Sequence, residues 1–494
     1  MSTETRPAEK AEPESLGARA IRGTMWTVVR YLTEYTLRLG SNLILTRLLF
    51  PEAFGLLALV NAFIAGLTML SDVGIAASVV QNPRGEEPAF LRTAWSFQVV
   101  RGFFLWFIAS SLASVMAGVY QQPELHVLIP VAGLTVLMAG FNSISLARKK
   151  RRIELGRLAA IQISGRLSAV IVMITWSLIS PSVWALVAGS LVGAFTKLLL
   201  SHTILGGTTL RFGWDRESVR QLFDFGKWIF VSTILAFLAG QADRLIFGRL
   251  LPIATLGVYS IALMFAAIPT QLIWAIGNMV LFPTFSRSAN SSRSFEATYR
   301  SALRPLYVLG ALPVACLAAA GPALIDALYD PRYADAGWML QPLAFATWVQ
   351  ILQTVSGAAL MAVGEPRRLA LGNGSKFAAM LVLVPSGFIF FGPMGGICGL
   401  AAAETFRYAV LAHGVRDHGL PGPGLDFAHT ALPVLAAAAG FAAGTLTADS
   451  DNPWLRLGCA VGGVLLLWLP VAAVVLRKEI AQAVAGLRSR SSKA

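Results

Sequence analysis

Long apolar segments separated by short polar connections dominate the chain. A helix needs about 20 apolar residues to cross the hydrocarbon core of a bilayer, and about fourteen segments reach that length. The pattern therefore predicts an all-α polytopic membrane protein with about 14 transmembrane helices. The expected spans are 24–48, 54–79, 95–119, 125–147, 158–179, 183–205, 223–247, 256–284, 303–328, 338–362, 367–391, 395–415, 428–447 and 454–476.

Basic residues are concentrated in every second connection. One set of connections carries Arg84, Arg216 and the run Arg148-Lys149-Lys150-Arg151-Arg152, whereas the alternate set, such as 121–123 and 180–182, is nearly free of Lys and Arg. Connections rich in Lys and Arg stay on the cytoplasmic side of a membrane. We therefore expect a multi-pass membrane protein with both termini in the cytoplasm.

An internal repeat divides the chain. Arg47-Leu48-Leu49 followed by Gly55 matches Arg249-Leu250-Leu251 followed by Gly257, at a constant offset of 202 (249 − 47). Two halves of six helices would have the same membrane orientation and be related by an axis along the membrane normal. The expected parts are a disordered cytoplasmic tail (1–22), an N-lobe (23–206), a cytoplasmic linker (207–221), a C-lobe (222–418), a second linker (419–427), two extra C-terminal helices (428–477) and a basic cytoplasmic tail (478–494).

Composition agrees with a membrane protein and limits its chemistry. Hydrophobic residues make up 55% of the chain and charged residues only 13%, and the mean hydropathy is +0.64, too apolar for a soluble protein. The net charge of +14 is best explained by topology and anionic lipid headgroups, so no nucleic-acid partner is expected. The three cysteines fall in apolar segments and no phosphate-binding glycine loop occurs, so neither a metal, a cofactor nor a catalytic residue is expected.

The first apolar segment carries Arg30, Glu34 and Arg38, which are four residues apart and therefore share one helix face. One carboxylate cannot neutralise two guanidinium groups, and a charge in a bilayer centre costs on the order of 2.5–3.5 kcal/mol. This face should meet water, protein or an anionic ligand. A structural role is the alternative, in which Glu34 pairs with one arginine and Asp72 with the other. At the offset of 202 the equivalent positions are uncharged: Ser232, Ala236 and Gly240.

Other ionisable residues lie in the apolar segments. Arg101 and Arg166 are deep, so a cavity role and a structural ion pair are both open. Asp72 could break or gate the second helix, or bind a ligand. Asp243 and Arg244 are neighbours, point about 100° apart on a helix and should find different partners. Residues near helix ends are expected to extend toward headgroups; these are Lys197, Lys227, Arg244, Lys376 and Arg407.

Three stretches resemble a known family. They are 45–58 (LTRLLFPEAFGLLA), 70–81 (LSDVGIAASVVQ) and 241–251 (QADRLIFGRLL). They are similar to the polysaccharide-transporter branch of the multidrug/oligosaccharidyl-lipid/polysaccharide exporter superfamily, which comprises O-antigen-flippase-like proteins of bacteria. The resemblance covers nearly the whole chain.

The resemblance implies two six-helix lobes that open alternately to the two sides of the bacterial inner (plasma) membrane around a cationic cavity. It implies a polyprenyl-pyrophosphate-linked oligosaccharide as the substrate, such as an O-antigen, capsule or exopolysaccharide repeat unit. By their chemistry, Arg30, Glu34, Arg38, Arg101 and Arg166 are the candidate cavity residues. Asp72, Asp243 and Arg244 are candidates for gating or ion coupling.

The same resemblance sets expectations for partners and energy. Besides membrane lipids, the expected partners are a polysaccharide polymerase and glycosyltransferases of one pathway, and the transporter itself is expected to be a monomer. H⁺, Na⁺ or the membrane potential would drive transport. Two alternatives are an ion-coupled drug antiporter of the same superfamily and a membrane polymerase or ligase. The second is disfavoured because the longest extracytoplasmic connection, near 330–337, is short.

Overall fold

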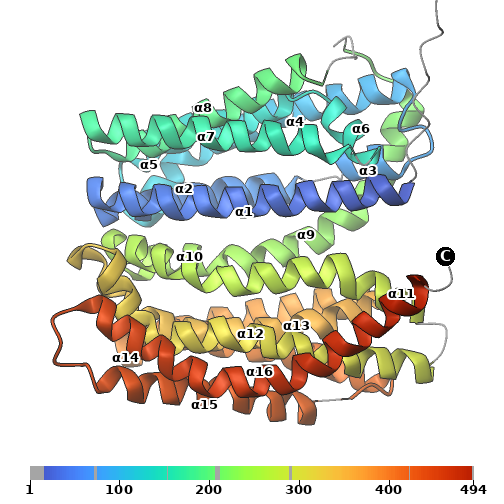
Figure 1. The fold of residues 1–494 in the computed structure, drawn as a ribbon. Coiled ribbons are helices and arrows are strands. Elements are labelled where there is room, and N and C mark those ends of the chain that lie inside the picture. The colour runs from blue at the N-terminus through green and yellow to red at the C-terminus, as the bar shows by residue number, and fades with distance from the viewer. Residues whose placement is uncertain are drawn as a thin grey trace, which may run out of the picture. The chain divides into compact units, whose positions relative to one another are not determined.

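The computed structural model describes residues 16–71, 75–152, 154–205, 212–288, 292–421 and 423–491, and these residues form helices and connections (Figure 1). The helices are α1 (Leu16–Leu48), α2 (Pro51–Leu70), α3 (Ile75–Gln81), α4 (Pro88–Tyr120), α5 (Leu125–Phe141), α6 (Ser145–Arg151), α7 (Leu155–Ile179), α8 (Val183–Thr203), α9 (Arg216–Leu250), α10 (Ile253–Ile276), a π-helix (Gly277–Leu281), α11 (Phe282–Ser288), α12 (Ser292–Leu328), a 3₁₀ turn (Pro331–Tyr333), α13 (Ala336–Ala362), α14 (Pro366–Asp417), α15 (Pro423–Thr445) and α16 (Pro453–Ser491).

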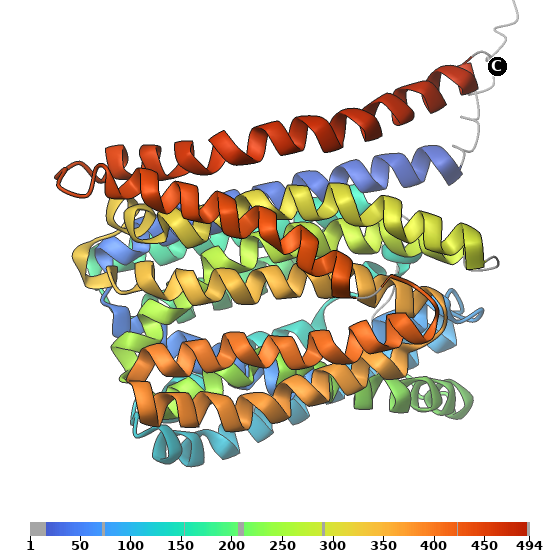
Figure 2. The same ribbon diagram turned by 90° about the horizontal axis from the view of Figure 1, so that it is seen from below.

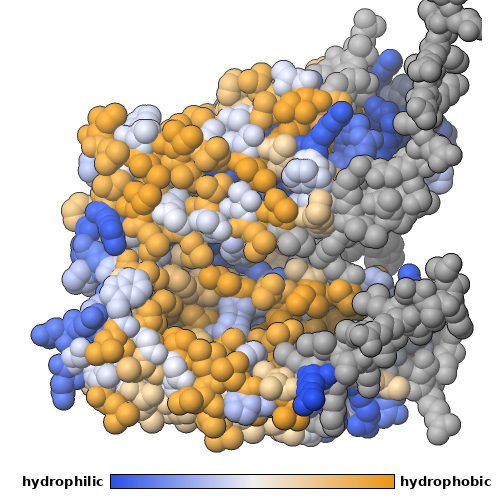
Figure 3. Space-filling model, in the orientation of Figure 1, coloured by the Kyte–Doolittle hydropathy of each residue, from blue (hydrophilic) through white to orange (hydrophobic). Residues whose placement is uncertain are grey.

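Many of these helices can cross a membrane. Among the described residues, ten are long and apolar enough to do so, or eleven if the bent pair α5 and α6 forms one span. The protein is therefore a multi-pass, all-α membrane protein. The count of fourteen stays a prediction, because α5 has only 17 residues and α1 carries three charges in its apolar part. Figure 3 shows hydrophobic side chains over most of the visible face and hydrophilic ones near the helix ends.

Two expected spans are broken. The segment 54–79 was expected to be continuous, but α2 ends at Leu70 and α3 begins at Ile75. The segment 125–147 bends by 60° between α5 and α6. Polar residues explain the second break, because buried Asn142 and Ser143 lie between the two helices and the Ser143 amide donates to the Ser201 hydroxyl at 3.0 Å. A helix is interrupted where side chains satisfy its backbone instead.

α14 consists of two helices. Its 52 residues would be about 78 Å long if straight, more than twice a hydrocarbon core. The backbone of Gly392 is non-helical (φ 64°, ψ −152°), and Pro393 follows it. A methyl group on Gly387 would lie 2.2 Å from the carbonyl oxygen of Gly395, so the two halves fold back on each other. Spans 367–391 and 395–415 are therefore separate, as predicted.

Both expected tails are largely helical where they are described. α1 begins at Leu16 and α16 continues to Ser491, so a disordered stretch over 16–22 is wrong. The reason is local sequence, because Leu16, Ala18, Arg19 and Ala20 are strong helix formers and the last proline of this stretch is at position 13. Residues 1–15 and 492–494 lie outside the described part of the chain.

The described chain forms two compact units. Unit 1 comprises Met1–Leu45, Ser71–Ala113 and His126–Phe230, and unit 2 comprises Thr46–Leu70, Ser114–Leu125 and Val231–Ala494. α2 belongs to unit 2 because it packs along α10. The division into six-helix lobes stays a prediction.

Glycines allow α2 and α10 to touch within unit 2. A methyl group on Gly55 would lie 2.1 Å from the carbonyl oxygen of Ile253, and one on Gly257 would lie 1.9 Å from that of Pro51. At the repeat offset of 202, Pro51 of α2 is equivalent to Ile253 of α10, and Gly55 is equivalent to Gly257. The contact of Gly55 with Ile253 and the contact of Gly257 with Pro51 are therefore equivalent to each other. The packing therefore agrees with the repeat in the sequence.

The two additional C-terminal helices are anchored to the rest of unit 2 (Figure 2). Buried Asp426, in the first turn of α15, accepts hydrogen bonds from Tyr307 of α12 at 3.0 Å and Tyr408 of α14 at 2.6 Å. On α16, the Trp468 indole donates to the Val308 carbonyl oxygen of α12 at 2.7 Å. These polar contacts fix both helices against the apolar surface of α12.

Candidate functional site

Charged side chains from three helices of unit 1 gather into one group. α1 contributes Arg30, Glu34 and Arg38, α7 contributes Arg166, and α8 contributes Lys197. We call these five residues the basic cluster. Arg166 lies about 16 Å along α7 from Leu155, close to the middle of this helix of 25 residues.

Small residues bring the three helices together. A methyl group on Gly156 of α7 would lie 3.1 Å from the indole nitrogen of Trp26 on α1. One on Gly193 of α8 would lie 2.7 Å from the carbonyl oxygen of Gly165 on α7. Such close backbone contacts are typical of helix packing in membranes. They place Lys197, one turn after Gly193, beside the turn of α7 that carries Arg166.

Arg30 is the best-defined member of the basic cluster. Its Nη1 donates to Gln162 Oε1 of α7 at 2.7 Å, and to Glu34 Oε1 and Oε2 at 3.3 and 3.4 Å. Its guanidinium also lies 4.3 Å from the ring centroid of Tyr31. The side chains of Arg30 and Glu34 remain 22% and 28% exposed. Gln162 therefore orients Arg30, whereas Glu34 contributes charge at longer range.

The remaining cations interact through the same carboxylate. Arg166 is attracted by Glu34 and repelled by Arg38, and Lys197 is attracted by Glu34. The side chains of Arg166 and Lys197 are partly buried among apolar helices, a position that is costly for a cation. Arg38 is the most exposed of the four cations. Within the basic cluster, three cations thus interact with one carboxylate, and Arg38 lies close enough to repel Arg166.

The structure brings some of the sequence-predicted residues together. Arg30, Glu34, Arg38 and Arg166 meet in the basic cluster, while Arg101 of α4 donates through Nε to the Ser71 hydroxyl at 3.0 Å. Asp72 lies outside the described residues. Whether any of these side chains binds a substrate stays a prediction.

Asp243 and Arg244 belong to α9 in unit 2. Asp243 is buried and accepts a hydrogen bond from Tyr259 of α10 at 2.8 Å. Arg244 donates to Gln241, and its Nη1 lies 4.0 Å from Asp243 Oδ1. The two neighbours therefore have different principal partners, as expected from their angle on the helix.

Sequence reasoning missed Lys197 and Gln162 as members of the site. Lys197 was expected to extend toward the headgroups, but it interacts with Glu34. Gln162 and Arg166 are four residues apart on α7, a spacing that could have identified a second polar face.

Lys376 and Arg407 were also expected to extend toward the headgroups, and both predictions were wrong. Lys376 of α14 is buried and pairs with Glu404 at 2.6 Å, and Arg407 is attracted by the same carboxylate. Gln350 and Gln353 of α13 also donate to Glu404, at 2.6 and 3.3 Å. The Glu404 carboxylate neutralises these cations inside unit 2, so neither side chain needs to extend to the membrane surface. The side chain of Lys227 lies outside the described part.

Comparisons with known proteins identify the family of this chain. A family model described as "Polysaccharide biosynthesis protein" matches residues 44–336. The succinoglycan biosynthesis transport protein ExoT of Rhizobium meliloti is 25% identical, over 73% of this chain and 76% of its own. The lipopolysaccharide biosynthesis protein WzxC of Escherichia coli is 23% identical, over 70% of this chain and 71% of its own.

A solved structure has a similar fold. The lipid II flippase MurJ in its inward closed conformation has a TM-score of 0.69 at 12% identity, and the match covers 93% of this chain and 100% of that one. The likeness establishes the fold. Because the family model covers more than half of the sequence, the resemblance noted from 45–58, 70–81 and 241–251 is confirmed: the chain belongs to the polysaccharide biosynthesis protein family, in the flippase-like branch of the exporter superfamily.

Proposed function

We propose that this protein is a flippase that moves a polyprenyl-pyrophosphate-linked oligosaccharide from the inner to the outer leaflet of the bacterial inner membrane. The observation that carries the proposal is the basic cluster, which brings four cations and only one carboxylate together from three helices of unit 1. Membership of the polysaccharide biosynthesis protein family supports the same substrate class.

The chemistry of the basic cluster suits a pyrophosphate. A guanidinium group can donate two parallel hydrogen bonds to phosphate oxygens, and an ammonium group acts as a compact positive charge. Arg30 and Arg166 would supply the first kind of contact and Lys197 the second. Glu34 would offset only part of the cost of burying these cations, so a further anion among them would be favourable.

Transport would proceed by alternating access, with the expected lobes 23–206 and 222–418 opening in turn to the cytoplasm and the periplasm. No cofactor is required, and H⁺, Na⁺ or the membrane potential would supply energy. Glycosyltransferases would build the substrate on the cytoplasmic side and a polymerase would use it on the other. We propose a monomer with both termini in the cytoplasm.

Alanine substitution tests the site in cells. Arg30→Ala combined with Arg38→Ala should abolish surface-polymer production, because the anionic headgroup loses two cations. Quantifying the variant protein in isolated membranes separates lost transport from lost protein. Normal polymer production by the double variant would contradict the assignment.

Two alternative functions make different forecasts. A membrane polymerase or ligase would change the covalent structure of the lipid-linked glycan in liposomes, whereas a flippase leaves it unchanged; mass spectrometry of the recovered lipid distinguishes them. A drug antiporter would exchange small cations for H⁺ or Na⁺. The excess of cations in the basic cluster disfavours cationic drugs, since like charges repel.

A further inference from the structure

Glu34 is the only acidic member of the basic cluster, and it is held loosely. Its two oxygens lie 3.3 and 3.4 Å from the same Arg30 nitrogen, near the outer limit of a hydrogen bond. The same nitrogen makes its short contact, 2.7 Å, with Gln162 instead. Arg30 therefore keeps its position through a neutral partner and would not collapse if Glu34 moved away.

Glu34 also lies where its charge reaches cations of two other helices. It attracts Arg166 of α7 and Lys197 of α8, besides Arg30 on its own helix. A single carboxylate therefore partly neutralises cations from three helices. Its side chain is 28% exposed, so another anion can approach the same cations.

We infer that Glu34 is a resident counter-anion that competes with the anionic headgroup of the substrate for the basic cluster. The inference rests on the proposed function. In the empty site Glu34 neutralises part of the cluster, and the incoming phosphate groups displace it. A transporter must release its cargo, and such competition keeps headgroup binding from becoming too tight.

Binding of inorganic pyrophosphate to the purified full-length protein tests this role by calorimetry. Glu34→Gln keeps the shape of the side chain but removes its charge, so affinity should rise about tenfold, or about 1.4 kcal/mol. Glu34→Asp retains the charge and should stay within about threefold of the wild type. Arg30→Ala should lose binding.

Each outcome has one meaning. Tighter binding by Glu34→Gln, together with loss in Arg30→Ala, supports the counter-anion. Equal or weaker binding by Glu34→Gln, with Arg30 still required, overturns the counter-anion and leaves the proposed function standing. Failure of the wild-type protein to bind pyrophosphate would overturn both. Thermal unfolding of each variant shows whether the fold is intact.

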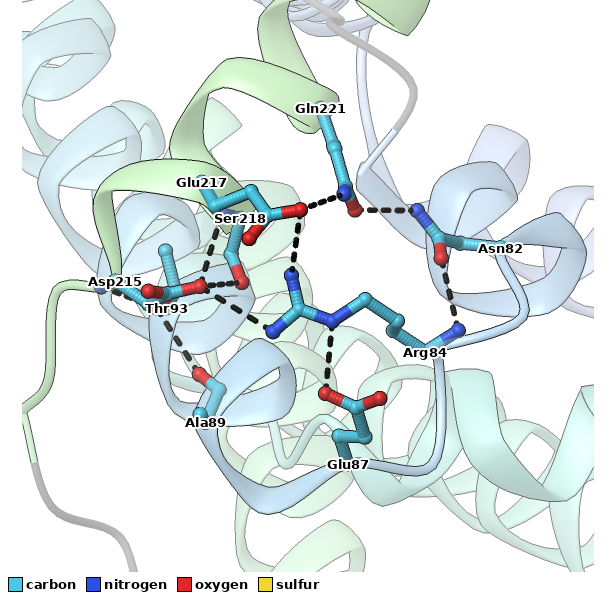
Figure 4. A network of polar contacts seen from close by, with 9 residues as sticks. All are labelled: Asn82, Arg84, Glu87, Ala89, Thr93, Asp215, Glu217, Ser218 and Gln221. Carbon is cyan, nitrogen blue, oxygen red and sulfur yellow. Dashed lines mark hydrogen bonds and ion pairs between the residues drawn. The ribbon is translucent and has the colours of Figure 1, made fainter.

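An independent set of contacts concerns the end of the linker together with the first turns of α9. Residues 212–222, which we call the linker strap, lie on α3 and α4 within unit 1 (Figure 4). Arg84, just after α3, donates to Glu87 at 2.8 Å and reaches Asp215 at 3.5 Å and Glu217 at 3.7 Å. Asn82 donates to Gln221 at 3.0 Å.

The rest of the linker strap is held equally closely. The backbone amides of Gly213 and Asp215 donate to the hydroxyls of Ser96 and Thr93, at 3.1 and 3.0 Å. Asp215 in turn accepts the Ser218 amide at 3.0 Å, as an N-terminal helix cap does. Leu222 is fully buried in the apolar cluster of α3 and α4.

We infer that the linker strap stays docked on α3 and α4 throughout transport, so that bending between the halves occurs inside α9, beyond Leu222. The boundary between the compact units supports this position, because it lies between Phe230 and Val231. The linker strap thus acts as part of unit 1.

A disulfide tests the inference. A Cβ atom on Gly213 would lie 3.3 Å from that of Arg92, close to disulfide geometry, so Arg92→Cys/Gly213→Cys should cross-link almost completely after Cys316, Cys398 and Cys459 are replaced by alanine. The oxidised protein should transfer lipid-linked oligosaccharide within about twofold of its reduced form. Little cross-linking, or a loss of transfer that reduction restores, would overturn the inference.

Discussion

Gly55 and Gly257 lie against each other's helix: a methyl group on Gly257 would be 3.1 Å from the amide nitrogen of Gly55 and 1.9 Å from the carbonyl oxygen of Pro51. Backbone atoms cannot retreat as a flexible side chain can. The repeat in the sequence places both glycines at equivalent positions, so the same type of glycine–backbone contact occurs twice, once from each helix.

Substitution of either glycine should destabilise the protein. Gly55→Ala or Gly257→Ala would force α2 and α10 apart and lower the free energy of unfolding by about 1–3 kcal/mol. Gly240→Ala is the matched control, since nothing lies within 4 Å of its added methyl group, and it should stabilise α9 by about 0.5–1 kcal/mol. Thermal unfolding in detergent measures both changes. Equal melting temperatures for all three variants would contradict the close contact.

The buried pair Lys376 and Glu404 gives a second prediction. Lys376→Met leaves a carboxylate that is 2% exposed without its cation and should cost about 3–5 kcal/mol, while Lys376→Met/Glu404→Gln should recover most of that loss. The exposed pair Arg300 and Glu296, at 2.8 Å, is the control, and Arg300→Met should cost less than about 1 kcal/mol. If the double variant is no more stable than Lys376→Met, the unpaired Glu404 carboxylate is not the cause of the lost stability.

Stability at low pH should depend on Glu86, which lies in the connection before α4. Hydrogen bonds from Arg152 and Arg148 hold the pKa of its carboxyl group below the ordinary value of 4.5. A lowered folded-state pKa contributes stability above the unfolded pKa, and this stability is lost as the pH falls through the folded pKa. The difference in unfolding free energy between wild type and Glu86→Gln should therefore be constant above about pH 5 and shrink below pH 4.5. Chemical denaturation from pH 7 to pH 3 checks this, and a constant difference throughout would refute it.

Lys197 should contribute to anion binding although its sequence position suggested a surface role. Lys197→Met should weaken pyrophosphate binding about tenfold, because a partly buried cation that is attracted by Glu34 is lost. Lys150→Met removes an equal charge from an exposed position and should change the affinity less than twofold. Titration calorimetry of both variants provides the comparison. Equal effects would mean that only net charge matters.

The sequence was sufficient to group the charged residues of α1, but not to identify the residues of α7 and α8 that lie beside them. A spacing of four defines one helix face, so Arg30, Glu34 and Arg38 could be grouped without a structure. Gln162 and Lys197 could not be added, because no local pattern shows which helix faces which. The contact that joins α7 and α8 depends on Gly165 and Gly193, and glycines fit many alternative packings.

Helix breaks were predictable only where glycine and proline marked them. Gly392 and Pro393 were correctly assigned to a connection. The bend after Phe141 was missed because Asn142 and Ser143 are compatible with a helix, and the break depends on the distant Ser201 hydroxyl. Likewise, Lys376 was misplaced because its partner Glu404 is 28 residues away (404 − 376) on the other half of α14.

Leaflet transfer in liposomes tests the central claim most directly. Wild-type protein and the variant Arg30→Ala/Arg166→Ala would be reconstituted with a polyprenyl-pyrophosphate-linked oligosaccharide, and glycan on the outer leaflet measured with a lectin that cannot cross the bilayer. We predict transfer by the wild type and transfer at the protein-free rate by the variant, with the lipid chemically unchanged in both. Equal transfer by the two proteins, or none by the wild type under an imposed H⁺ or Na⁺ gradient or membrane potential, would contradict the account.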